Sequence, residues 1–325
     1  MIIFRTDASI KTGFGHLRRS TYLASLLKSK TGILFCISSG SDKIVTRFLE
    51  EKKWSHCSLK QMNQRLPSPV KSVVFDLRYF SNEDIQLIHQ AKTNNWTTVQ
   101  VTDLGLDQQE VDYTIDASVD KMFPYSKDKK VLDGPDYAIL HHKFRHFHKV
   151  KRKYRKRIKK VFICFGGAVE YRKLRKMVDL TSRYQWEIKI APGFYLKRSA
   201  QETLRRIYPG ILFVGKTESL ARPFFEADVA LITPGIAAYE AAAAGTPALY
   251  FYHHNQQKFI ANSLEKKGVG LDIANIDDLL QVNLAEKMNA LTLEKRIDIG
   301  GKAKQLVDAR GVYRVIDFFE QYKII

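Results

Sequence analysis

Short apolar runs alternate with helical patterns along the whole chain. Apolar runs bounded by turn residues are typical of buried strands, and apolar positions three or four residues apart are typical of helices. In the first half, the strand-like runs fall at residues 2–4, 32–38, 73–76 and 97–102, and the helical patterns fall at 16–28, 43–52 and 82–94. This alternation predicts a mostly parallel sheet that is covered by helices on both faces.

The same alternation starts again in the second half. Strand-like runs fall at residues 160–165, 186–191, 211–214, 229–232 and 247–251. We therefore expect an α/β protein with two domains, residues 1–142 and 161–325, joined by a basic linker at 143–160. A last helical pattern near 311–322 could return to the first domain. The cleft between two such domains is a natural place for a ligand.

Composition favours a cytoplasmic protein. The chain has 325 residues and 45% of them are hydrophobic, which is enough for two cores. The three cysteines form no Cys-x-x-Cys pair, so neither a metal site nor a disulfide framework is indicated. Asp7 comes too early for the apolar centre of a secretory signal. Turn residues at 234–235 and 245–247 divide the apolar stretch 229–252 into pieces too short to span a membrane.

Much of the positive charge lies in the predicted linker. The formal net charge is +19, and residues 143–160 hold eleven lysines or arginines and no acid. Such a run is typical of a solvated face, but it also suits contact with an anionic membrane surface. A nucleic-acid partner is less supported, because few aromatic residues interleave with the charges and no recognition motif is present.

His16 is the first candidate for catalysis. It follows an apolar strand and a loop that contains Gly13 and Gly15, and it stands where a helix begins. A strand, a glycine loop and a helix N-terminus can together hold an anion or a reacting group. Histidine suits general base chemistry near neutral pH. The alternative is a histidine that caps the helix or orients a ligand. Arg18 and Arg19 face either a ligand or solvent.

Two further loops in the second half follow strands and begin helices. Gly235 and Ile236 begin the alanine-rich helix, where backbone N–H groups favour phosphate. Glu240, the single charge in that stretch, either accepts hydrogen bonds from a sugar diol or lies at the edge of the helix near water or a basic residue. The polar run that starts at His253 contains Asn255 and Gln256, but adjacent histidines rarely chelate one metal ion.

These motifs resemble a known family. The runs 4–9 and 13–19 are similar to the opening of the UDP-2,4-diacetamido-2,4,6-trideoxy-β-L-altropyranose hydrolases of pseudaminic acid biosynthesis, and of the related spore-coat polysaccharide proteins. Further matches run the length of the chain, at 136–140, Phe144, 165–167, Glu240, 245–247 and 255–256.

The resemblance implies a GT-B fold, in which two Rossmann-like domains face each other across a cleft. It also implies a UDP-sugar substrate, with His16 activating water and Asn255 and Tyr79 assisting at the reacting sugar. UDP would bind the second domain, with its phosphates near Gly235 and its ribose on Glu240. The remaining substrate contacts would come from Arg5, Asp7, Gly15, Arg19, Arg78, Gly166, Gly167, Ile236 and Gln256. No motif requires a metal ion or a cofactor.

One segment departs from the family pattern. The family has Asp-His-Tyr after its third strand, whereas this chain reads Asp76-Leu77-Arg78-Tyr79. An arginine at the tyrosine's place would suit an acidic or phosphate-bearing sugar. The leading hypothesis, which comes from the resemblance, is a UDP-sugar hydrolase. The alternatives are a glycosyltransferase of the same fold and a non-catalytic nucleotide-sugar-binding protein.

Overall fold

The computed structural model describes residues 1–10, 12–62, 69–105, 108, 110–122, 125, 130–167, 170–215 and 217–325. The chain forms two compact units, each with its own parallel sheet. The first unit comprises residues 1–139 and 310–325, and the second comprises residues 140–309. Each unit is described by itself below.

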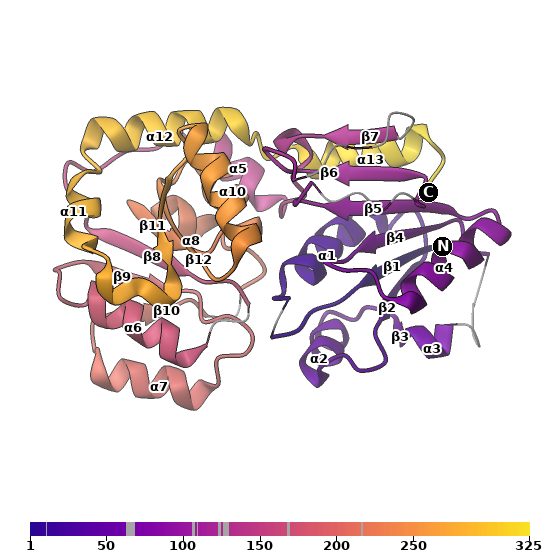
Figure 1. Cartoon of the computed structure of the whole chain (residues 1–325), viewed down its shortest axis with the longest axis horizontal. Helices are drawn as coiled ribbons and strands as arrows, with labels where there is room; N and C mark the ends of the chain where they lie inside the picture. Colours follow the sequence, from indigo (N-terminus) through magenta and orange to yellow (C-terminus); the bar gives the residue numbers. More distant parts are fainter. Residues whose placement is uncertain are drawn as a thin grey trace. The chain divides into compact units, whose positions relative to one another are not determined.

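The first unit is built on a seven-stranded parallel sheet of order β3-β2-β1-β4-β5-β6-β7 (Figure 1). Its strands are β1 (Ile2–Thr6), β2 (Ile33–Ile37), β3 (His56–Ser58), β4 (Ser72–Asp76), β5 (Thr97–Thr102), β6 (Tyr113–Asp116) and β7 (Lys130–Asp133). Its helices are α1 (Gly15–Leu27), α2 (Lys43–Glu51), α3 (Leu59–Met62), α4 (Asn82–Thr93), a 3-10 turn at Pro135–Tyr137 and α13 (Gly311–Gln321). Strand order reverses beside β1, so the ends of β1 and β4 lie at the place where ligands bind in such sheets.

Apolar strand residues and helix caps explain this arrangement. Every residue of β1 and β4 is buried, and one face of the sheet packs on apolar side chains of α3 and α4. Ser81 caps α4 through a capping box with Asp84. Helix α1 packs on β1, β4 and α13, so the last helix belongs to this unit.

The second unit has a six-stranded parallel sheet of order β10-β9-β8-β11-β12-β13. Its strands are β8 (Lys160–Cys164), β9 (Glu187–Ile190), β10 (Ile211–Phe213), β11 (Val229–Ile232), β12 (Ala248–Tyr252) and β13 (Leu271–Asn275). Its helices are α5 (Lys143–Lys149), α6 (Tyr171–Thr181), α7 (Arg198–Ile207), α8 (Ala221–Glu226), α9 (Ile236–Ala243), α10 (Asn255–Lys266), a 3-10 turn at Ile276–Gln281, α11 (Leu284–Asn289) and α12 (Leu293–Leu306).

Small residues let α9 and α12 approach closely. A Cβ added at Gly300 of α12 would lie 2.6 Å from the carbonyl oxygen of Gly245 and 1.9 Å from the hydroxyl of Tyr154. The alanines that follow Tyr239 in α9 are buried. The alanine-rich sequence is therefore a packing requirement of this helix pair.

The basic segment 143–160 differs from the solvated linker expected from the sequence. Its first part is helix α5, in which Phe144 is fully buried. The guanidinium of Arg152 donates to the carbonyl oxygens of Ala227 and Ala244, and the hydroxyl of Tyr154 donates to the carbonyl of Gly245 at 3.0 Å. The segment is part of the second unit because its inward side chains satisfy carbonyl groups at the ends of α8 and α9.

Within the part of the chain that the structure describes, no helix is both long enough and apolar enough to cross a membrane.

Candidate active site

His16 lies at the carboxyl edge of the first sheet. It is the second residue of α1, as the sequence predicts, and its Nδ1 lies 2.7 Å from Oδ1 of Asp76. Asp76 is the last residue of β4 and its side chain is 1% exposed, whereas the side chain of His16 is 13% exposed. A buried carboxylate therefore holds one ring nitrogen of a histidine that solvent still reaches.

Asp76 also receives donors from α1. Arg19 donates to it twice, from Nη2 to Oδ1 at 2.6 Å and from Nε to Oδ2 at 3.0 Å. Ser20 Oγ donates to Oδ2 at 3.0 Å. Burial opposes ionisation of Asp76, but the charge of Arg19 and the hydrogen bonds from His16 and Arg19 outweigh it and hold the pKa of Asp76 below its ordinary value. The carboxyl group is therefore charged at neutral pH.

The ionised Asp76 sets the tautomer of His16. A carboxylate accepts hydrogen bonds only, so in the neutral ring Nδ1 of His16 carries the hydrogen and Nε2 has the free lone pair. A neutral histidine oriented in this way by a buried carboxylate can take a proton from a hydroxyl group or from water. General base chemistry is therefore available at this edge of the sheet.

Arg19 is buried between two acids. Its side chain is 3% exposed, and Nη1 lies 3.4 Å from Oδ1 of Asp103, which follows β5. Burial alone would lower the pKa of Arg19, but Asp76 and Asp103 outweigh that effect and raise it. The sequence predicts Arg19 as a substrate contact, whereas its burial and partners favour a role in holding Asp76.

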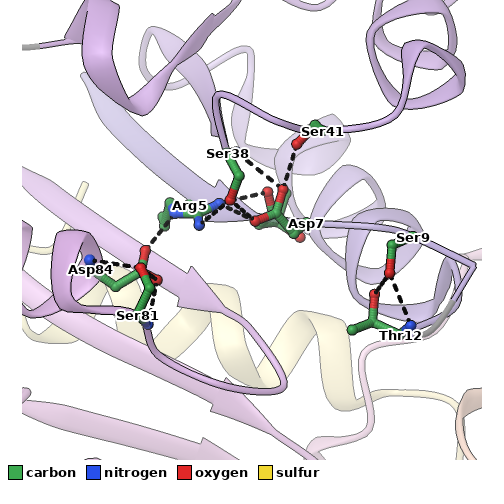
Figure 2. A network of polar contacts seen from close by, with 9 residues as sticks. Arg5, Asp7, Ser9, Thr12, Ser38, Ser41, Ser81 and Asp84 are labelled. Carbon is green, nitrogen blue, oxygen red and sulfur yellow. Dashed lines mark hydrogen bonds and ion pairs between the residues drawn. The ribbon is translucent and has the colours of Figure 1, made fainter.

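Arg5 and Asp7 form a second polar network beside this site (Figure 2). Arg5 is 2% exposed and donates from Nε to Asp84 at 2.6 Å, from Nη1 to Asp7 at 2.8 Å and from Nη2 to Ser38 at 2.8 Å. Asp7 in turn accepts from the backbone N–H of Ser38 and the hydroxyl of Ser41. These contacts join the ends of β1 and β2 to the start of α4, so they favour a structural role for Arg5.

Other residues predicted for the site lie in the loops that follow β1 and β4. Gly13 has φ of 78°, which favours glycine, and its N–H donates to the carbonyl of Ser9 at 2.8 Å, which turns the chain into Gly15 at the start of α1. After β4, the guanidinium carbon of Arg78 lies 5.4 Å from the ring centroid of Tyr79, and that tyrosine is 64% exposed. The structure thus places Arg78 and Tyr79 together on an exposed loop.

The carboxyl edge of the second sheet is formed by glycine loops and helix N-termini. Gly166 has φ of 73°, and a Cβ added at Gly193 would lie 2.7 Å from the carbonyl oxygen of Gly166 and 3.1 Å from that of Gly167. Gly235 has φ of 143° and precedes Ile236, the first residue of α9, with no neighbour within 4 Å of an added Cβ. The space beside Gly235 is therefore open at the start of α9, and the N-terminus of a helix suits a phosphate group.

Glu240 and the start of α10 complete this edge. Glu240 is 2% exposed, so it is buried and does not lie at the solvent-exposed edge of the helix. Asn255 and Gln256 are the first residues of α10, and His254 caps that helix by accepting from the N–H of Gln257 at 3.3 Å. This capping accounts for His254 without a metal ion. Among the described residues, no group of three His, Cys, Asp or Glu side chains could hold a metal.

Sequence reasoning did not select Asp76, Asp103 or Ser20. The signal for the two acids was present, because each stands directly after an apolar strand-like run in the first half of the chain. What was missing was the strand order, which puts β4 beside β1 and β5 beside β4.

The two parallel sheets and their strand orders define a class of fold. Structural comparison shows a GT-B fold over nearly the whole chain. MurG from Acinetobacter baumannii has a TM-score of 0.66 at 14% identity, covering 98% of this chain and 99% of that chain. CalG4, the calicheamicin glycosyltransferase, has a TM-score of 0.60 at 12% identity, covering 99% of this chain and 98% of that chain. Medicago truncatula UGT71G1, solved with UDP-glucose, has a TM-score of 0.61 at 11% identity, covering 97% of both chains.

Sequence comparison adds a full-length relative. The spore coat polysaccharide biosynthesis protein SpsG of Bacillus subtilis (strain 168) is 24% identical over 342 aligned positions, which cover 97% of each chain. No protein-family model matches the chain.

Proposed function

We propose that this protein is an enzyme that acts on a nucleotide sugar, and that it transfers the sugar to an acceptor hydroxyl during synthesis of a surface polysaccharide. The observation that carries the proposal is the His16–Asp76 pair, with 2.7 Å between Nδ1 and the carboxylate, at the carboxyl edge of a parallel sheet. The GT-B fold and the name of the full-length relative support the substrate class.

His16 acts as the general base in this proposal. The acceptor oxygen forms a bond to the anomeric carbon while the bond from that carbon to the diphosphate oxygen breaks. The electron pair leaves with the nucleoside diphosphate, and the acceptor proton moves to Nε2 of His16. Asp76 stabilises the imidazolium that forms.

The second unit binds the nucleotide in this proposal. N–H groups at the start of α9, next to Gly235 and Ile236, accept the diphosphate, because a helix N-terminus carries partial positive charge. Glu240 accepts hydrogen bonds from the ribose, and the Gly166–Gly167 turn leaves room for the nucleotide. Asn255 and Gln256 contact the diphosphate or the sugar. UDP-glucose in one of the structural neighbours supports a uridine nucleotide.

Hydrolysis is the second candidate function, because a histidine base activates water as readily as a sugar hydroxyl. The resemblance of the runs 4–9 and 13–19 to UDP-sugar hydrolases favours it. Fold neighbours that include a glycosyltransferase, together with a relative named for polysaccharide biosynthesis, favour transfer.

One assay separates the two functions. Purified protein is incubated with a panel of UDP-sugars, with and without sugar or glycan acceptors, and both UDP and the carbohydrate products are measured. Transfer predicts that UDP release depends on the acceptor and that a glycoside forms. Hydrolysis predicts UDP and free sugar in buffer alone. If UDP binds by calorimetry but no donor reacts under any condition, the proposal of an enzyme is wrong.

The outward side of the segment 151–159 would supply a membrane contact if the acceptor is carried by an anionic membrane. Arg152 and Tyr154 point into the second unit, whereas Lys151, Lys153 and Lys156 are exposed. Sedimentation with phosphatidylglycerol vesicles tests this: the wild type should bind in a salt-sensitive way and Lys151→Ala/Lys153→Ala should bind less. Equal binding to phosphatidylcholine vesicles would contradict it.

A further inference from the structure

The guanidinium of Arg19 joins two carboxylates that come from different strands. Its Nε and Nη2 contact Asp76 at the end of β4, and its Nη1 lies 3.4 Å from Asp103 after β5. The same Nη2 lies 3.2 Å from Nδ1 of His16. All of these groups are at least largely buried, so their charges are weakly screened.

Arg19 has two opposed effects on His16. It fixes the orientation of Asp76 through a bidentate contact, but it also cancels the negative charge of that carboxylate. A neutral ion pair gives little electrostatic stabilisation to a histidine ring that has taken up a proton. A second carboxylate on the far side of Arg19 restores one negative charge to the cluster, so that the cluster becomes neutral when the ring is protonated.

We propose that Asp103 is a positioning residue that acts through Arg19: its carboxylate restores the negative charge that Arg19 removes from Asp76, so that His16 accepts the acceptor proton. The kinetic part of this inference rests on the proposed function. Its electrostatic part concerns His16 alone and holds with or without turnover.

Two other charged groups lie on the neighbouring strands β6 and β1. Asp116 ends β6 and is fully buried, and its pKa is raised by burial and by the charge of Asp103, against hydrogen bonds from Tyr125 and Ser118. On the β1 side, Arg5 pairs with Asp7 and Asp84, so its charge is more than compensated within that group. Asp103 is thus the acid that directly contacts the outer nitrogen of Arg19.

Substitutions of Arg19 and Asp103 should shift the base in opposite directions. Asp103→Asn removes a negative charge, so the acid limb of the pH–rate profile should move about half a unit lower, and kcat on the plateau should fall by up to about threefold with KM little changed. Arg19→Gln removes a positive charge, so the acid limb should move higher. The double variant should return the limb close to its wild-type position. Asp103→Glu keeps the charge and should keep that position.

A readout independent of activity is the pH dependence of the His16 ring signals, followed by NMR on the full chain. The matched control is Asp112→Asn, because Asp112 directly precedes β6 of the same sheet but its carboxylate binds Thr98, accepting from its N–H and its hydroxyl at 2.7 Å each. We expect the transition of the His16 signals to move to lower pH in Asp103→Asn and to higher pH in Arg19→Gln, and to stay in place in the control.

Shifts of the same sign in both variants would overturn the inference, and so would a transition in Asp103→Asn that coincides with that in Asp112→Asn. Failure of all UDP-sugars to react would overturn the proposed function but leave this NMR result to stand by itself. If Asp103→Asn does not fold, Arg19→Gln and Asp103→Glu still carry the test, and an unmoved transition in Arg19→Gln contradicts the inference.

Discussion

The two sheets end in different ways at their carboxyl edges. The edge of the first sheet carries charged side chains that contact one another, with Asp76 accepting from His16, Arg19 and Ser20. The edge of the second sheet carries glycines and helix starts, with Gly235 beside open space and Gly193 against the carbonyl of Gly166. The first edge is suited to moving a proton and the second to accepting a phosphate group. In the proposed function, the two parallel sheets therefore contribute different parts of one reaction.

The largest effect outside His16 itself is expected for Asp76→Asn. The amide removes the charge that selects the tautomer of His16, so kcat should fall at least about a hundredfold. It also leaves the buried charge of Arg19 with one partner fewer, so the free energy of unfolding should fall by about 3 kcal/mol. Steady-state kinetics and urea unfolding check both effects.

The pH dependence of that stability loss has a fixed sign. The pKa of Asp76 is held below its ordinary value, so its contribution is present at neutral pH and is lost as the pH falls through the acid range. Unfolding free energies of wild type and Asp76→Asn should therefore converge towards low pH. A difference that grows on acidification would contradict the charged state assigned to Asp76.

A glycine pair in α12 tests whether the second unit depends on close packing. Gly300→Ala should lower the free energy of unfolding by about 2 kcal/mol, because the new Cβ would lie 2.6 Å from a backbone oxygen. The neighbouring Gly301 has nothing within 4 Å of an added Cβ, so Gly301→Ala should leave stability unchanged or raise it by up to about 1 kcal/mol. Equal destabilisation by both would contradict the packing argument.

The phosphate role of the second edge is tested at Gly235. Gly235→Ala forces a residue with a Cβ into φ of 143°, which costs about 1–3 kcal/mol of strain at the start of α9. UDP binding measured by calorimetry should weaken about tenfold, whereas kcat at saturating donor should change little. Gly210→Ala is the control, because Gly210 has open space and no left-handed φ. Unchanged UDP affinity in Gly235→Ala would separate α9 from the nucleotide site.

Much of this fold follows from the sequence. The hydrophobic pattern identified most of the longer strands and the helices α1, α2, α4, α9 and α13, but it did not identify α6, α7, α10 or α12. His16 lies at the start of α1 as predicted. The strands β3, β6, β7 and β13 were not identified, and β3, β7 and β13 include no fully buried residue. Their apolar patterns are weak signals by themselves.

The candidate site could be predicted only in part. Periodicity and glycine loops identify His16 and Gly235, since both stand at the junction of a strand and a helix. The contact between His16 and Asp76 joins residues 60 positions apart, and it depends on a strand order that one sequence does not contain. The burial of Arg19 depends on the same strand order. Because the sequence does not contain that order, Arg19 was predicted as a substrate contact.

The central claim is that His16 is the base of a nucleotide-sugar enzyme, and UDP release by His16→Ala tests it most directly. His89→Ala is the matched control, because His89 pairs with Glu110 at 2.7 Å on the exposed surface of the same unit. We predict a loss of turnover of about a hundredfold or more in His16→Ala with UDP affinity retained, and wild-type turnover in His89→Ala. Turnover in His16→Ala equal to that of His89→Ala would contradict the account.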